Sequence, residues 1–214
     1  MIELSFEEAR VVGCLIEKAV TTPQYYPLTL NALVTACNQT SNRNPVVSYD
    51  EATVQDALTS LRERGLTRIV YSTSNRATKF RHVLDEQLEL DPQELAVLDV
   101  LLLRGPQTGG ELRTRTDRLA EFNSLGEVED VLSRLAARDE PLVVRLERQP
   151  GQKEARYAHL LSGEPVVPEG GFAEPAPSSG GGASRNDRLD ALEAEVEALK
   201  GEVARLRELL EQVL

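Results

Sequence analysis

The sequence predicts a mainly α-helical fold with small β-hairpins, an α+β class, and three observations lead to it. The order of segments in residues 1–86 recurs in residues 87–164, which indicates two related domains. Residues 165–184 are rich in Pro, Gly, Ala and Ser and predict a flexible linker. Residues 185–214 carry a heptad repeat and predict a coiled-coil helix.

Each predicted domain opens with a helix, LSFEEARVVGCLIEK in the first copy and LDPQELAVLDVLLLR in the second. Ser5 and Asp91 suit the N-cap, because Glu8 and Glu94 follow three residues later as capping-box partners. Gly105 suits the position just after the second copy of this helix. The two openings therefore predict equivalent helices.

The second helix of each domain is shorter, TLNALVTACN in the first copy and GGELRTRTD in the second, where Thr108 and Glu111 form a capping box. The third helix gives the strongest match, TVQDALTSLRERG against EVEDVLSRLAARD. An apolar stripe at helical spacing is common to both copies: Val54, Leu58 and Leu61 align with Val128, Leu132 and Leu135.

Two β-type runs around a turn close each domain, LTRIVY and RATKFRHV in the first, PLVVRLE and KEARYAHL in the second. Lys79 to His82 align with Arg156 to His159. Three helices followed by a two-stranded wing are the order of a winged helix. We therefore expect two tandem winged-helix domains.

The composition gives no sign of catalysis. Cys14 and Cys37 lie in amphipathic stretches and are expected to fill the core rather than perform redox or metal chemistry. The sequence has no recognisable zinc spacing, phosphate loop or serine elbow, so we predict no catalytic residue, cofactor site, metal ligand or enzyme activity. It also has no signal-peptide pattern and no apolar run of about 18 residues, which predicts a cytoplasmic protein with no membrane contact.

The predicted coiled coil is expected to make the protein a parallel dimer. One heptad position is filled by Leu189, Val196, Val203 and Leu210, and the other by Leu192, Leu199, Leu206 and Val213. Flanking charges of opposite sign would meet across a parallel pair: Arg188 with Glu193, Glu195 with Lys200, and Glu202 with Arg207. Packing of this helix back onto its own domains, or pairing with another protein, is the alternative.

The segments RVVGCLIEKAVTTPQYYPLTLNALVTACNQTSNRNPV, NRATKF and LLLRGPQTGGELRTR, with the Leu-rich tail, closely resemble the YceH-like family of bacterial proteins. The resemblance covers residues 1–164 and extends to the tail, while the linker differs. It implies a tandem winged-helix fold, and no established biochemical role comes with it.

DNA binding is the first functional hypothesis, because winged helices commonly place their third helix in the major groove and the wing along the backbone. The candidate residues lie in the first domain: Arg43, Gln55, Thr59, Arg68, Arg76, Lys79 and Arg81. Charge complicates this hypothesis, since residues 1–86 hold 9 basic and 10 acidic side chains while residues 87–164 hold 10 basic and 15 acidic side chains.

Docking onto a protein partner through the winged helices is the second hypothesis. The Arg113, Arg115 and Arg118 cluster is either a basic patch or paired with nearby carboxylates.

Overall fold

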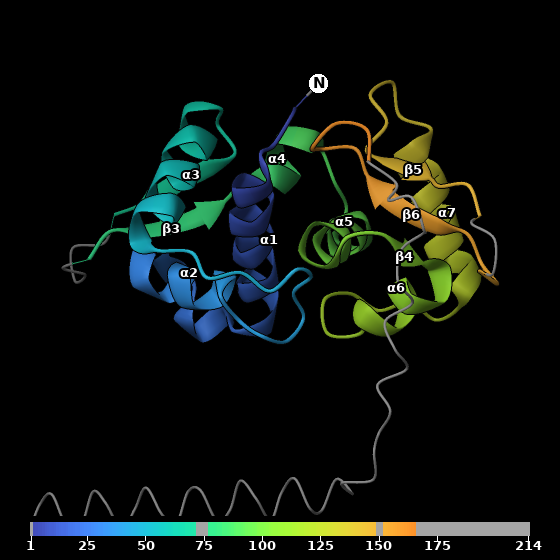
Figure 1. Ribbon diagram of the computed structural model, residues 1–214, viewed down its shortest axis with the longest axis horizontal. Helices are drawn as coiled ribbons and strands as arrows, with labels where there is room; N and C mark the ends of the chain where they lie inside the picture. The colour runs from blue at the N-terminus through green and yellow to red at the C-terminus, as the bar shows by residue number, and fades with distance from the viewer. Residues whose placement is uncertain (1, 72–76, 149–151, 166–214) are drawn as a thin grey trace, which may run out of the picture. The chain divides into compact units, whose positions relative to one another are not determined.

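The computed structural model describes residues 2–71, 77–148 and 152–165 of the 214-residue chain. These residues belong to one compact unit, Met1–Gly171. The fold is mixed α/β, with seven α-helices and two small antiparallel sheets in the described part of the chain (Figure 1). None of these helices combines the length and the apolarity needed to cross a membrane. The predicted coiled coil and its heptad residues lie outside the described residues.

The helices and strands follow one another in the same order in both halves. The first half contains α1 (Phe6–Thr21), a 3-10 turn η1 (Pro23–Tyr25), β1 (Leu28–Thr29), α2 (Leu30–Cys37), α3 (Glu51–Glu63), β2 (Thr67–Val70) and β3 (Lys79–His82). A short helix, α4 (Leu84–Leu88), leads to the second half. The second half contains α5 (Pro92–Arg104), β4 (Gln107–Thr108), α6 (Gly109–Arg115), α7 (Leu125–Ala136), β5 (Val143–Arg145) and β6 (Arg156–His159).

The predicted helix starts are confirmed at α1, α5 and α6. Each begins with a capping box in which the N-cap side chain accepts from the third helical N–H and the Glu at that position accepts from the N-cap N–H. Gly105 follows α5 with a φ of 71°, a left-handed conformation that glycine adopts without strain. Local sequence therefore determines where these helices begin and where α5 ends.

Each sheet has three strands, where the sequence predicted a two-stranded hairpin. The strand orders are β1-β3-β2 and β4-β6-β5, so the short β1 and β4 add an edge to each hairpin. The strand registers support the predicted repeat, because Lys79 pairs with Thr29 in one sheet and Arg156 pairs with Thr108 in the other. Both threonines are the N-caps of the helix that follows.

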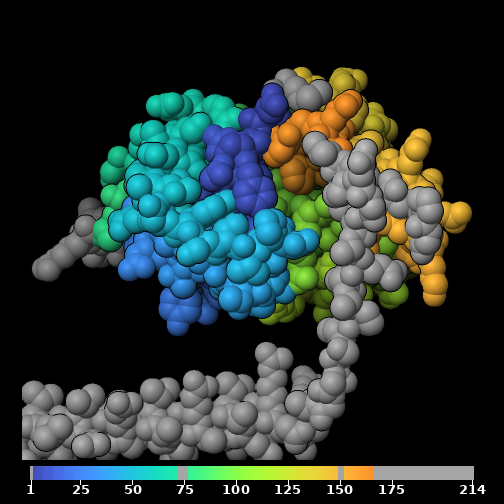
Figure 2. All heavy atoms as spheres, viewed as in Figure 1, coloured from blue at the N-terminus to red at the C-terminus, as the bar shows by residue number. Residues whose placement is uncertain are grey.

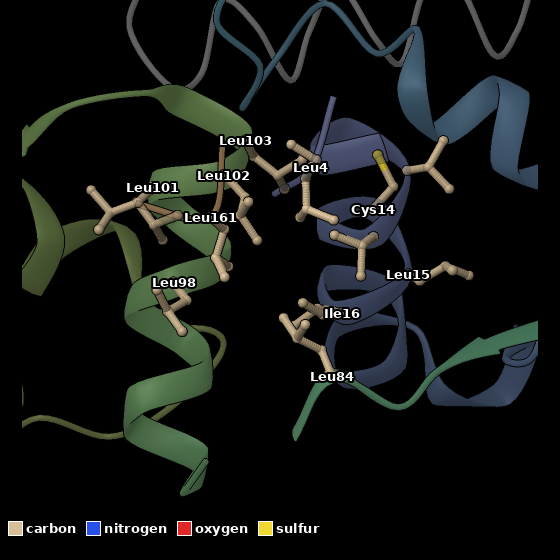
Figure 3. Close-up of a cluster of buried hydrophobic side chains, with 14 of the residues drawn as sticks. Leu4, Cys14, Leu15, Ile16, Leu84, Leu98, Leu101, Leu102, Leu103 and Leu161 are labelled. Atoms are coloured by element: carbon tan, nitrogen blue, oxygen red, sulfur yellow. The ribbon is translucent and has the colours of Figure 1, made fainter. Parts of the chain in front are cut away.

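One hydrophobic core runs through both halves, and α1 packs against α5 at its centre. Figure 3 shows Ile16 of α1 and Leu102 and Leu103 of α5 in the space between these two helices. In the space-filling view the atoms of the two halves abut directly (Figure 2). The backbone N–H of Leu4 also donates to the carbonyl of Leu161 at 2.6 Å, which ties the chain start to the end of the second half.

Gly13 allows α1 and α5 to approach closely. A Cβ atom at this position would lie 2.8 Å from Cδ2 of Leu103 and 3.4 Å from Cβ of Leu102. Leu103 is itself buried, so its side chain has little room to move aside. The missing side chain is therefore part of the packing between the halves.

We expect Gly13→Ala to be less stable than Gly126→Ala by about 1–3 kcal/mol, the usual cost of overpacking a core. Gly126 is the matched control, because it is also helical and a Cβ there would meet only Ser124 Oγ at 3.6 Å. Both substitutions gain helix propensity, so their difference isolates the clash. Chemical unfolding of the two variants measures it, and equal stabilities would contradict the close packing.

Candidate nucleic-acid interface

The third helix of the first half, α3, presents one polar face to solvent. Its N-cap is Asp50, whose carboxylate accepts from the backbone N–H of Thr53 at 2.8 Å. The predicted core stripe of Val54, Leu58 and Leu61 is buried. The polar side chains of α3 therefore lie on the opposite side of the helix from the core, as the spacing predicted.

Gln55, Thr59 and Arg62 form a stripe on that polar face, since they follow one another at i, i+4 and i+7. The Gln55 amide donates to the Thr59 hydroxyl at 3.3 Å, and that hydroxyl donates to the Gln55 carbonyl at 2.9 Å. Arg62 is exposed, and its side chain has no hydrogen bond or ion pair with any described residue. The sequence analysis missed Arg62, although its spacing from Gln55 and Thr59 would have identified it.

A surface hollow of about 560 Å³ lies beside this stripe, between α3, the start of α2 and the hairpin. It is lined by Thr29, Leu30, Asn31, Gln55, Arg62, Ile69, Ala77, Thr78 and Phe80. The hollow therefore extends from α3 to the face of the β2–β3 hairpin that carries Ile69 and Phe80.

The basic residues of the β2–β3 hairpin lie on the face opposite the hollow. Arg68 pairs across the hairpin with Arg81, and Val70 pairs with Lys79, so these four side chains share one face of the sheet. Glu86 of α4 lies beneath this face, with ion-pair distances of 3.1 Å to Arg68 and 2.8 Å to Arg81. The hydrogen bond from Arg81 lowers the pKa of Glu86.

The predicted DNA-binding residues therefore divide into two surfaces. Gln55 lines the hollow and Thr59 continues its helix stripe, while Arg68, Lys79 and Arg81 lie on the outer face of the hairpin. Arg76 lies outside the described residues. The sequence placed each side chain on a helix or a strand. It could not show that Glu86 of α4 lies beside the arginines on the outer face of the hairpin.

Arg43 requires a correction, because it was predicted as a candidate DNA-binding residue. Its side chain is 0% exposed and forms a bidentate pair with Glu17, at 2.7 and 3.2 Å. The guanidinium also donates to the carbonyls of Ala36 and Asn42. Its charge is satisfied inside the protein, so Arg43 is not available to a phosphate.

The second half lacks a free cation at the position of Lys79. The equivalent residue, Arg156, is buried and lies 2.6 Å from Glu111, three residues after the Thr108 cap. Three residues after the Thr29 cap the first half has Ala32 instead. The Lys79 side chain consequently has no carboxylate there and forms no hydrogen bond or ion pair with a described residue.

The outward face of α7 is acidic. Glu129 and Asp130 are exposed, and the single cation of this face, Arg134, lies 2.7 Å from Asp91 and 3.3 Å from Glu94. Because Arg134 is paired with these two carboxylates, it does not neutralise Glu129 and Asp130, and the surface of α7 keeps a net negative charge. Its electrostatics oppose phosphate contact.

Both cysteines are free and fully buried, and burial raises the pKa of the Cys14 thiol. Within residues 2–71, 77–148 and 152–165, no three His, Cys, Asp or Glu side chains are grouped to hold a metal ion.

Sequence comparison places the chain among known bacterial proteins. Residues 4–152 match the family described as "Protein of unknown function, DUF480". A UPF0502 protein of Geobacter sulfurreducens is 52% identical over 199 residues, covering 92% of this chain and 90% of the relative. A UPF0502 protein of Photobacterium profundum is 49% identical over 218 residues, covering 99% and 98%. The resemblance seen in the sequence is confirmed: the chain belongs to the DUF480, or UPF0502, family of bacterial proteins whose function is not established.

Proposed function

We propose that this protein is a non-enzymatic DNA-binding regulator built from two winged helices, and that it contacts DNA through the first of them. The contact surface is the α3 stripe of Gln55, Thr59 and Arg62 with the hollow beside it. The support is the repeated order of three helices and a hairpin, the arrangement in which winged helices expose a reading helix next to a wing. The second winged helix packs on the first through α1 and α5.

The observation that carries the proposal is the unpaired arginine of this stripe. The Arg62 guanidinium has no partner among the described residues, while an amide and a hydroxyl that can both donate and accept precede it on the same helix face. Phosphate contacts come from such cations and base contacts from such amides. The second half supplies no equivalent, because Ala136 occupies the position that corresponds to Arg62, and Arg134 of the same helix is held by Asp91 and Glu94.

Asp56 and Glu63 are exposed on the same helix and weaken the attraction of phosphate. We therefore expect weak binding that is sensitive to salt and is strengthened when these carboxylates are neutralised. Asp56→Asn with Glu63→Gln should raise the affinity for duplex DNA.

We expect Arg62→Ala to weaken binding to any duplex DNA and to reduce the slope of log affinity against log salt by about 0.9 for the lost phosphate contact. Fluorescence anisotropy with a labelled duplex at several salt concentrations measures both quantities. Arg68→Ala is the matched control, because Arg68 is also an exposed arginine but lies on the opposite face of the hairpin beside Glu86. Wild-type protein that does not bind at low salt would exclude the DNA proposal, and equal slopes for both variants would exclude the α3 surface.

Docking onto a protein partner is the second candidate, and the acidic face of α7 favours it. Glu129 and Asp130 are exposed, and the arginine beside them is engaged internally. Such a face complements a basic protein surface rather than DNA. Glu129→Lys with Asp130→Lys should leave DNA affinity unchanged or raise it, whereas it should abolish binding to a partner of this kind.

We also propose that the protein is a dimer, joined by residues 185–214 as a parallel coiled coil. The support is the unbroken heptad pattern and the three g to e′ pairs of opposite charge. Two copies on flexible tethers would allow each dimer to engage a repeated target with an avidity about 100 to 10,000 times that of a single copy.

A further inference from the structure

A small cavity of about 40 Å³ lies where the two halves meet. Its lining residues come from α1, the loop after α2, α5, and α6 with the segment that follows: Glu17, Thr21, Asn42, Asp99, Val100, Leu103, Arg104, Arg115, Arg118 and Leu119. The loop is fixed on the end of α5, because the N–H of Asn44 donates to the carbonyl of Leu103 at 2.9 Å.

Asp99 is the unexplained residue of this cavity. It is 1% exposed, and its Oδ1 atom has no hydrogen-bond partner among the described residues. Burial raises the pKa of Asp99 well above its ordinary value, and the neighbouring Glu17 carboxylate raises it further. Burial thus favours the protonated form of this carboxyl group, and in that form it can donate a hydrogen bond.

Positive charge surrounds the cavity. Arg118 is exposed and its side chain has no partner among the described residues. The Arg104 side chain is half-buried and makes one hydrogen bond to a described residue, to the Asn42 side chain. Burial and the nearby Arg115 guanidinium lower the pKa of Arg104. Glu111 lies 3.4 Å from Arg115, so it offsets only part of this charge.

The two acidic residues that line the cavity, Glu17 and Asp99, do not cancel the charge of these arginines. Glu17 is already paired with Arg43 and Lys18, at 2.7 and 3.1 Å, and Asp99 is neutral when protonated. The cavity thus combines an excess of guanidinium groups with one buried hydroxyl donor. That combination is complementary to an anion with several oxygen atoms.

The cavity volume limits the size of the anion. One water requires about 10–15 Å³ of such space, so 40 Å³ holds roughly three or four water-sized atoms. A single phosphate group has this size, whereas a base or a sugar would have to remain outside the cavity.

We propose that this cavity binds one phosphate group, either as the free ion or as part of a small phosphate monoester, with Arg104 and Arg118 as its cationic ligands and Asp99 as a hydrogen-bond donor. Because both halves contribute to the lining, the bound phosphate links them. The site is distinct from the α3 surface, so its test does not depend on DNA binding.

Isothermal titration of the full chain with inorganic phosphate, and separately with glycerol phosphate, tests the proposal in a chloride buffer. We expect one site per chain and at least a tenfold loss of affinity in Arg104→Gln, the effect of removing one charge-assisted hydrogen bond. Arg113→Gln is the matched control, because Arg113 is an exposed arginine of α6, the helix that contributes Arg115 to the cavity, but does not itself line the cavity. Binding of glycerol phosphate but not of the free ion would identify a monoester as the ligand.

Variants of Asp99 separate binding from folding. Asp99→Asn keeps an N–H donor of the same shape and should retain binding within a few-fold. Asp99→Leu should lose binding and at the same time unfold at a higher temperature, because it removes a buried polar atom that lacks a partner. A wild type that binds neither probe, or equal binding by wild type, Arg104→Gln and Asp99→Leu, would overturn the proposal and leave water as the occupant.

Discussion

Replacing Glu17 with Gln is expected to destabilise the protein by about 3–5 kcal/mol, because it leaves the charge of Arg43 buried and unpaired. The Arg43 side chain is 0% exposed. Among the described residues, Glu17 is the only one whose carboxylate lies within 4 Å of the Arg43 guanidinium. Urea unfolding at neutral pH measures the loss. Glu63→Gln is the matched control, since Glu63 is an exposed glutamate on a helix surface and its replacement should change stability by less than about 0.5 kcal/mol.

The double replacement Glu17→Leu with Arg43→Met removes both charges and is expected to be more stable than Glu17→Leu alone. Removing both partners avoids an uncompensated charge, which is the larger part of the cost. If the single and double variants are equally unstable, the hydrogen bonds from Arg43 to the Ala36 and Asn42 carbonyls determine the stability instead.

The contribution of Glu17 depends on pH in a defined direction. Burial raises its pKa, but the hydrogen bonds and charge of Arg43 outweigh burial and leave the pKa below its ordinary value. A carboxylate whose pKa is lower in the folded state stabilises the fold above its unfolded pKa of about 4.3, and this stabilisation is lost as the pH falls. The stability difference between wild type and Glu17→Gln should therefore shrink below about pH 4.

Local features of the fold could be predicted from the sequence because they depend on residues close together in the chain. The N-caps at Ser5, Asp91 and Thr108 depend on a partner three residues away, and all three are confirmed. The repeat identified the equivalent strands as well, and the pairing of Lys79 with Thr29 and Arg156 with Thr108 agrees with it.

Features that depend on distant residues could not be predicted in this way. The Glu17–Arg43 pair joins residues 26 positions apart, and a loop arginine next to asparagines resembled a surface residue. Asp99 is in α5 among apolar residues, where the sequence offers no sign that it borders a cavity between two halves. β1 and β4 are two residues long, too short to produce an alternating pattern.

Deleting residues 185–214 is expected to convert a dimer into folded monomers. The reason is the predicted coiled coil, which lies outside the described residues and rests on the heptad pattern alone. The compact unit Met1–Gly171 contains the whole core described above, so the shortened protein should keep its helix content. Analytical ultracentrifugation at tens of micromolar, with circular dichroism, measures both properties.

Charge reversal distinguishes a parallel dimer from other arrangements of this helix. Lys200→Glu with Arg207→Glu places like charges at two of the three predicted g to e′ pairs and should weaken the dimer. Adding Glu195→Lys and Glu202→Arg restores opposite charges at those pairs and should restore it. An antiparallel pair, or a helix folded onto its own chain, brings different residues together and would not be rescued by this particular exchange. A monomeric wild type, or a dimer that survives deletion of the tail, would therefore exclude the parallel coiled coil as the basis of assembly.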